Sequence, residues 1–196
     1  MRKTVLAIAL PAMPLGKAII GTIGLATGLL LAGLVCAEAQ EPPGGRRGTG
    51  LPVPRYVSLK TDRVNLREGP SKDHRTAWVF QRAGLPVEIV AEYETWRRIR
   101  DSEGTEGWVL HSLLSGRRTA LVMPWLKDPA ASISLTDRAD DRGDAVARLQ
   151  PGVIANVKDC TGTWCRVVIV MDGGRDVDGY IRQEKLWGVY PNERVE

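Results

Sequence analysis

The residues with the most reactive side chains in this sequence are two cysteines and two histidines. Cys160 and Cys165 flank one short turn, whereas His74 and His111 lie well upstream. A cysteine nucleophile needs a histidine base within hydrogen-bond reach, and these residue types fall in different parts of the chain. The hydrolase motifs H-E-x-x-H and G-x-S-x-G are absent. We therefore predict a protein that is not an enzyme, with no metal and no cofactor.

Aromatic and cationic side chains remain as candidates for contact with a ligand. Aromatic rings offer flat apolar surfaces, and arginine suits carboxylates. The candidate ligand-binding residues are Tyr93, Trp96, Arg98, Trp108, Trp164 and Tyr180. The basic cluster around Arg98 also includes Arg97, Arg100, Arg117 and Arg118. Packing is the alternative role for each tryptophan, and a solvated surface is the alternative for the arginines.

These candidates sit in a sequence that repeats itself. Residues 83–99 align without a gap on residues 151–167, and both segments contain a glycine, an alternating apolar stretch and Thr-Trp-x-Arg. Further along, Gly107-Trp-Val matches Gly179-Tyr-Ile. A period of this length suits two small domains in tandem.

The repeat also bears on the two cysteines. Two thiols at the ends of one turn pair readily in an oxidising compartment. Glu92 and Arg97 occupy the same positions in the first copy, and opposite charges can also face each other across a hairpin. We predict a Cys160–Cys165 disulfide. Two free thiols, a redox pair or half of a metal site are the alternatives.

Apolar residues alternate with polar ones through most of both copies, which is typical of half-buried strands. No sustained helical periodicity occurs after the N-terminal segment. The predicted strands cover residues 64–67, 85–92, 97–100 and 107–110 in the first copy and 132–135, 153–157, 166–170 and 179–182 in the second. A helical turn is predicted after the last strand of each copy, over 111–114 and 183–186. The fold class is all-β.

The N-terminal residues 1–39 are typical of a signal peptide. A positively charged start precedes an uncharged segment over residues 18–37 and a small-x-small tripeptide. We predict cleavage between Ala39 and Gln40 and a periplasmic protein that meets the membrane only through this segment before cleavage. An uncleaved anchor is the alternative, because the uncharged segment is just long enough to span a bilayer. A lipoprotein modified at Cys36 is a third option.

Composition sets the domain boundaries. Proline and glycine are frequent after the signal peptide, as in a tether. The predicted parts are a linker over 40–54, a first domain over 55–118, a linker over 119–130 and a second domain over 131–191. The chain has 27 Lys and Arg against 23 Asp and Glu, so no nucleic-acid partner is expected.

Several segments of the first copy resemble the bacterial SH3-like (SH3b) domain. They are Val64-Asn-Leu-Arg-Glu-Gly-Pro70, Gly84-Leu-Pro-Val-Glu-Ile-Val90, Trp96-Arg-Arg-Ile-Arg100 and Gly107-Trp-Val-Leu-His-Ser-Leu-Leu114. The second copy resembles the same family through Leu149–Gly152, Trp164–Val167 and Gly179–Arg182, but lacks the Asn-x-Arg-x-Gly-Pro element. The resemblance implies two tandem five-stranded barrels and a non-catalytic role in the cell envelope.

Two functions follow from this resemblance. The first is recognition of peptidoglycan through clefts centred on Trp96 and Trp164. The second is an adaptor role, in which the domains bind peptide segments of another envelope protein. Leu110 and Leu113 stand where SH3 grooves for proline-rich peptides have a proline and a tyrosine, so we do not expect ligands of that kind.

Overall fold

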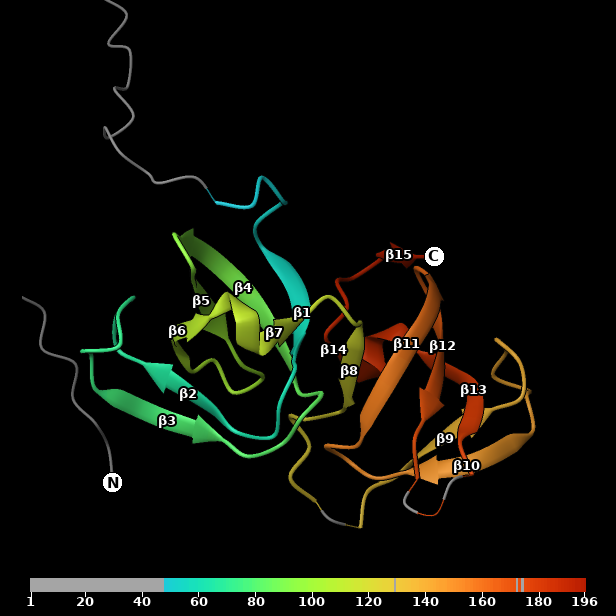
Figure 1. The fold of residues 1–196 in the computed structure, drawn as a ribbon. Helices are drawn as coiled ribbons and strands as arrows, with labels where there is room; N and C mark the ends of the chain where they lie inside the picture. The colour runs from blue at the N-terminus through green and yellow to red at the C-terminus, as the bar shows by residue number, and fades with distance from the viewer. Residues whose placement is uncertain (1–47, 129, 172, 174) are drawn as a thin grey trace, which may run out of the picture. The chain divides into compact units, whose positions relative to one another are not determined.

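The computed structural model describes residues 48–128, 130–171, 173 and 175–196 of the chain (Figure 1). The predicted signal peptide, with its cleavage site at Ala39 and Gln40, lies outside the described residues. The described residues belong to one compact unit. Its regular structure is β-strands and two short 3₁₀ turns, as the alternating pattern predicted. Within this part of the chain, no helix is long and apolar enough to cross a membrane.

The first domain is one antiparallel sheet with the strand order β3-β2-β6-β5-β4-β1-β7. Its elements are β1 (Arg55–Leu59), β2 (Val64–Arg67), β3 (Thr76–Phe80), β4 (Pro86–Tyr93), β5 (Trp96–Arg100), β6 (Glu106–Leu110), the 3₁₀ turn η1 (His111–Leu113) and β7 (Leu114–Ser115). In β2, Val64 and Leu66 are buried while Asn65 between them is exposed. This alternation places one face of each strand on a core of apolar residues.

The second domain repeats this plan in the order β10-β9-β13-β12-β11-β8-β14, with β15 also paired to β11. Its elements are β8 (Thr119–Val122), β9 (Ile133–Thr136), β10 (Ala145–Leu149), β11 (Ile154–Thr161), β12 (Trp164–Ile169), β13 (Val177–Arg182), the 3₁₀ turn η2 (Gln183–Lys185), β14 (Leu186–Trp187) and β15 (Arg194–Val195). The predicted strands and turns are therefore confirmed, with boundaries shifted by a few residues. Short additional strands bring the two sheets to seven and eight strands instead of five.

Two predicted boundaries differ from the structure. Residues 119–130 were expected to link the domains, but Thr119–Val122 form β8, which pairs with β11 and β14 in the second sheet. All four β8 residues are buried, as expected for a strand of the second sheet and not for an exposed connection. The C-terminal strand β15 likewise extends the second sheet beyond residue 191.

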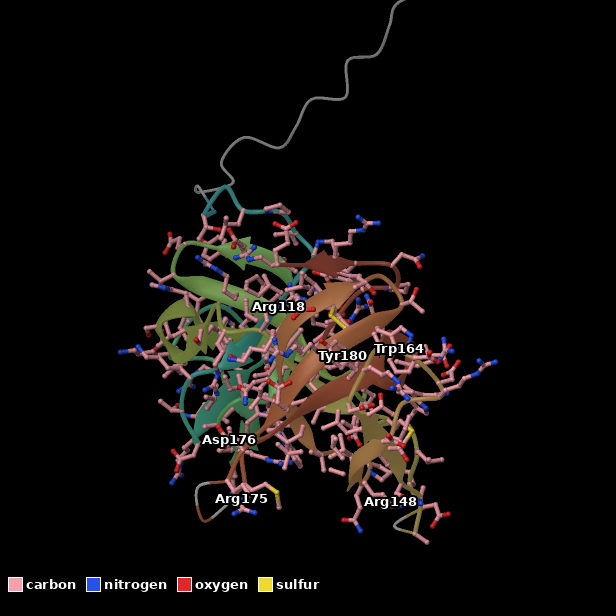
Figure 2. The ribbon with its side chains drawn as sticks, turned by 90° about the vertical axis from the view of Figure 1, so that its right-hand side faces the viewer. Arg118, Arg148, Trp164, Arg175, Asp176 and Tyr180 are labelled. Carbon is pink, nitrogen blue, oxygen red and sulfur yellow. A yellow bond between two sulfur atoms is a disulfide. The ribbon has the colours of Figure 1, made fainter. Side chains whose placement is uncertain are left out.

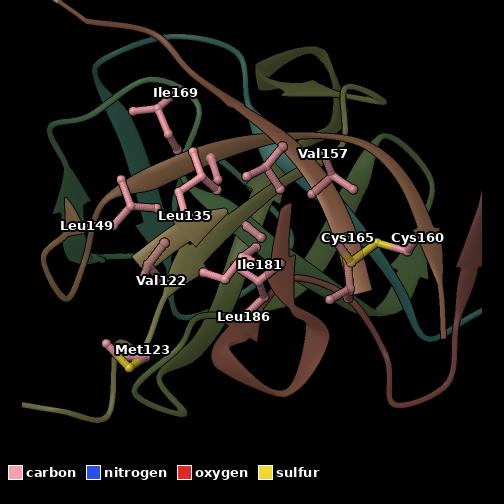
Figure 3. Packing of buried hydrophobic residues seen from close by; sticks show 14 residues of the cluster. Val122, Met123, Leu135, Leu149, Val157, Cys160, Cys165, Ile169, Ile181 and Leu186 are labelled. Atoms are coloured by element: carbon pink, nitrogen blue, oxygen red, sulfur yellow. A yellow bond between two sulfur atoms is a disulfide. The ribbon is translucent and has the colours of Figure 1, made fainter. Parts of the chain in front are cut away.

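The two central hairpins, β4–β5 and β11–β12, show what the repeat conserves and what it replaces. Each contains a bulge at a matching place in the longer strand. Glu92 and Arg97 are cross-strand partners in the first hairpin, and Cys160 and Cys165 are cross-strand partners in the second. The two cysteines form the predicted disulfide, which lies at one end of the second core (Figure 3).

An aromatic cluster joins residues of both repeats within the compact unit. The Tyr56 ring lies 5.2 Å from the Trp187 ring and 4.6 Å from the Tyr190 ring, measured between centroids. The Tyr190 hydroxyl donates to the buried Glu88 carboxylate at 2.8 Å, and Arg100 donates to the other carboxylate oxygen. Burial, with the nearby Glu88 charge, raises the pKa of Tyr56 to about 12. Burial and the hydrogen bond to Glu88 raise the pKa of Tyr190 as well. Both tyrosines therefore stay neutral in this contact at ordinary pH.

Candidate functional site

The outer face of the first sheet carries the predicted aromatic residues. Trp96 pairs with Leu110 and Arg98 pairs with Trp108 across β5 and β6, so alternation places these four side chains on one face. Tyr93 packs edge-on against Trp108, with 6.5 Å between ring centroids. The structure thus brings the four first-domain candidates together.

Trp96 is less exposed than a free binding platform would be. It is 7% exposed, and it is one of the residues that line a pocket of about 270 Å³. The pocket is lined by Arg63, Asn65, Arg67, Lys72, Trp96, Leu110 and Leu113. Trp96 therefore packs against its own domain and also forms part of a cleft, which combines the two roles considered for it. We call these seven residues the first cleft.

The first cleft is positively charged. Arg67 donates to the backbone oxygens of Lys72, at 3.0 Å, and His74, at 2.7 Å. Neutral carbonyls hold this guanidinium in place without cancelling its charge. Arg63 and Lys72 are exposed, and within the described part of the chain neither they nor Arg67 form an ion pair. A pocket lined by Trp96 and two leucines, together with three cations that form no ion pair within the described residues, suits a small ligand that carries carboxylates.

The arginines singled out from the sequence are mostly tied to carboxylates. Arg98 contacts Glu106 at 2.8 Å, Arg100 contacts Glu88 at 2.6 Å and Arg118 contacts Glu193 at 2.9 Å. Arg97 is buried against Glu92 at 3.2 Å. Because their charges are compensated within the fold, these four arginines do not form the expected free basic surface.

The second domain has the corresponding residues in a different arrangement. Trp164 on β12 and Tyr180 on β13 lie on neighbouring strands (Figure 2). Trp164 pairs with Arg182, at the position that Leu110 holds opposite Trp96. Thr136 faces Tyr180 where Arg67 faces Trp108. At these positions the second domain therefore lacks the anchored cation and has an arginine in place of an apolar residue.

Arg182 covers the Trp164 ring. Its guanidinium carbon lies 4.9 Å from the ring centroid, a cation–π geometry. Its Nε donates to Asp141 Oδ1 at 2.8 Å, and this hydrogen bond lowers the pKa of Asp141. The aromatic face predicted to bind a ligand in the second domain is thus occupied by a side chain of the same domain.

Replacing Arg182 by leucine should expose Trp164. We expect only a small fall in the free energy of unfolding, because the ion pair and the cation–π contact are both exposed to solvent. The Trp164 indole resonance should broaden more strongly when a neutral gadolinium chelate is added. The matched control is Arg166→Leu, which removes the arginine of another exposed ion pair, Arg166–Asp178, on the same sheet. Equal broadening in both variants would show that Arg182 does not cover the ring.

Other reactive residues have ordinary surroundings. The two cysteines are bonded to each other, and His74 and His111 are exposed. Among the residues that the structure describes, no group of three or more His, Cys, Asp or Glu side chains is placed to hold a metal ion.

Comparison with known proteins agrees with the tandem all-β architecture. The family model described as "Bacterial SH3 domain" matches residues 60–116 and again residues 132–188, together more than half of the chain. The chain belongs to this family and carries two such domains in tandem. A comparison with proteins of curated function found no match.

Solved structures similar to this chain include two proteins from Trichomonas vaginalis. NlpC2 is 12% identical over 68% of this chain and 48% of that protein, with a TM-score of 0.30. NlpC1 is 13% identical over 71% of this chain and 47% of that protein, also with a TM-score of 0.30. This chain therefore spans about half the length of each.

Sequence reasoning missed the cations of the first cleft. Arg67 belongs to the Asn-x-Arg-x-Gly-Pro element that carried the family resemblance, and the second copy lacks this element. The absence of this element from the second copy was the available signal that the two domains differ at these positions. Arg63 and Lys72 flank the element and have no distinguishing pattern of their own.

Proposed function

We propose that the protein is a non-catalytic binding protein of the bacterial cell envelope, and that its first cleft binds peptidoglycan stem peptides. The observation that carries this proposal is the Trp96 pocket with its three uncompensated cations. A stem peptide offers small apolar side chains to the floor of such a pocket and free carboxylates to its rim. The second domain, whose aromatic face is covered by Arg182, has a supporting role.

Two further observations support a non-catalytic role in the periplasm. The cysteines are joined in a disulfide, so neither is available as a nucleophile, and the bond suits an oxidising compartment. The N-terminal segment has the composition of an export signal. Binding without chemistry is consistent with the family, whose domains serve mainly as recognition modules.

The test is co-sedimentation of the purified protein with isolated peptidoglycan sacculi. The double variant Arg63→Glu/Lys72→Glu should bind at least tenfold more weakly at physiological salt, because it reverses two charges at the rim of the cleft. Arg138→Glu/Arg142→Glu changes the net charge equally in the second domain and is the control. We expect this control to bind like the unchanged protein.

Charge-reversal variants are preferable to Trp96→Ala. Because Trp96 is buried, its truncation would also destabilise the domain by about 3 to 5 kcal/mol and would confuse binding with folding. Equal weakening in both charge variants would indicate non-specific attraction and contradict the proposed site. Absence of sacculus binding by the unchanged protein would contradict the ligand and direct attention to peptides of envelope proteins.

A further inference from the structure

The second domain contains an apolar pocket whose lining includes neither Trp164 nor Tyr180. Its volume is about 490 Å³, and it lies where β10 and β12 end and where β9 and β13 begin. The lining residues are Ala130, Ala131, Ser132, Ala147, Arg148, Leu149, Gln150, Val153, Ile169, Met171 and Val177. Apolar side chains predominate, and Arg148 is the only charged group among them. We call this the β10 pocket.

The repeat explains why the pocket is open. Val64 pairs with Phe80 in the first domain and Ile133 pairs with Leu149 in the second, so Phe80 and Leu149 are equivalent. Two residues earlier, the first domain has Trp78 and the second has Ala147. The corresponding pocket beside Trp78 measures about 250 Å³. An alanine in place of the indole leaves room for a bulky apolar side chain supplied from outside.

The strand beside the pocket is also free to pair. β10 is the first strand in the order of its sheet, and within the described residues it pairs with β9 alone. The backbone groups on its outer edge can therefore accept another extended strand. Met171, at the pocket, is 53% exposed although its side chain is apolar. Such exposure next to an open strand edge is typical of a surface that is covered by a partner.

Charge indicates what else the partner carries. Arg148 is exposed, and it forms no ion pair with any residue that the structure describes. Ala147 and Arg148 are neighbours in β10, and both line the pocket. A strand paired with β10 would place an aromatic residue against Ala147 and an adjacent carboxylate near Arg148.

We propose that the second domain binds an extended segment of another protein along β10, with an aromatic side chain in the β10 pocket and an acidic residue beside Arg148. Main-chain hydrogen bonds to the strand edge supply affinity, and the pocket supplies selectivity. This surface is separate from the first cleft, so its use does not depend on peptidoglycan binding.

The probe is the peptide acetyl-Thr-Val-Phe-Glu-Val-Thr-amide, titrated into the ¹⁵N-labelled protein. We expect amide shifts confined to β10 and to the residues around Met171. Replacing the probe's phenylalanine by alanine, or methylating alternate backbone nitrogens of the probe, should weaken binding at least tenfold. These two probes leave the protein unchanged and so test the proposal without any effect on folding.

Protein variants complete the test. Ala147→Trp fills the β10 pocket, and Arg148→Glu reverses the charge of the residue beside it. Each variant should bind the peptide at least tenfold more weakly. Arg142→Glu in the same hairpin is the control and should leave binding unchanged, as should Arg63→Glu/Lys72→Glu in the first domain. Undiminished binding to Ala147→Trp, shifts outside the second domain, or no shifts at millimolar peptide would each overturn the proposal.

Discussion

Replacing Glu92 by alanine should lower the free energy of unfolding of the first domain by about 3 to 5 kcal/mol. The Glu92 and Arg97 side chains are only 7% and 5% exposed, and Arg97 Nε lies 3.2 Å from Glu92 Oε1. Removing the carboxylate leaves a buried guanidinium whose remaining partners are the backbone oxygens of Glu94 and Trp96. Denaturant-dependent hydrogen exchange of the β4 and β5 amides measures the loss in this domain alone.

Glu106→Ala is the control for this prediction, because it removes the exposed partner of Arg98 on the same sheet. We expect it to cost less than about 1 kcal/mol. The second domain suggests a rescue: Glu92→Cys with Arg97→Cys places two cysteines at cross-strand positions that correspond to Cys160 and Cys165. A loss as small for Glu92→Ala as for Glu106→Ala would show that the buried pair does not stabilise the domain.

Acidification should destabilise the first domain as Glu92 takes up a proton. Burial alone would raise the pKa of Glu92, but hydrogen bonds from Arg55 and Thr49 and the charge of Arg97 outweigh it and lower the pKa to about 2. The pKa of an ordinary glutamate is 4.5. The carboxylate therefore contributes its full stabilisation above pH 4.5 and loses it as the pH falls toward 2. The shift corresponds to at most about 3 kcal/mol.

The measurement is the free energy of unfolding of the first domain between pH 6 and pH 2, followed through β4 and β5 amides. The Glu92→Cys/Arg97→Cys variant, in its disulfide form, is the comparison because it has no carboxylate at this site. Its stability should depend less on pH by up to about 3 kcal/mol over this range. Parallel pH profiles for the two proteins would contradict the assigned role of Glu92.

Much of the fold could be predicted because burial follows strand alternation. Val64 and Leu66, with the exposed Asn65 between them, mark a buried face by their spacing alone. β8 was missed because Thr119–Val122 are buried throughout and show no alternation, so a short apolar segment between two domains resembled a linker. Its place in the second sheet depends on pairing with β11 and β14, which local sequence does not reveal.

The candidate site was predictable in its aromatic residues but not in its charges. Cross-strand pairing brings Trp96, Trp108 and Tyr93 to one face, as their spacing allowed. Whether an arginine is free depends on which carboxylate lies opposite in the folded sheet. Arg98 and Arg100 on β5 each meet a glutamate on a neighbouring strand, whereas Arg67 meets two backbone carbonyls and no carboxylate within the described residues. The sequence shows where the arginines are, but the pairing register of the strands decides which of them face a carboxylate and which can contact a ligand.

The two repeats have diverged at equivalent positions. A buried ion pair in one hairpin corresponds to a disulfide in the other, and the pocket beside Trp78 corresponds to the larger one beside Ala147. Similarly, Leu110 lies opposite Trp96 and lines the first cleft, whereas the equivalent residue of the second domain, Arg182, covers the Trp164 ring. One fold thus supports two unequal binding surfaces.

The central claim is that the first cleft binds a carboxylate-bearing envelope ligand. The most direct measurement is a titration of the ¹⁵N-labelled protein with a soluble disaccharide–tetrapeptide fragment of peptidoglycan. Binding in the first cleft should shift the resonances of the Trp96 indole and of the amides of residues 63–72 and 110–113, with the Trp164 indole unchanged. Shifts centred on Trp164, or none in the first domain at saturating fragment, would contradict it.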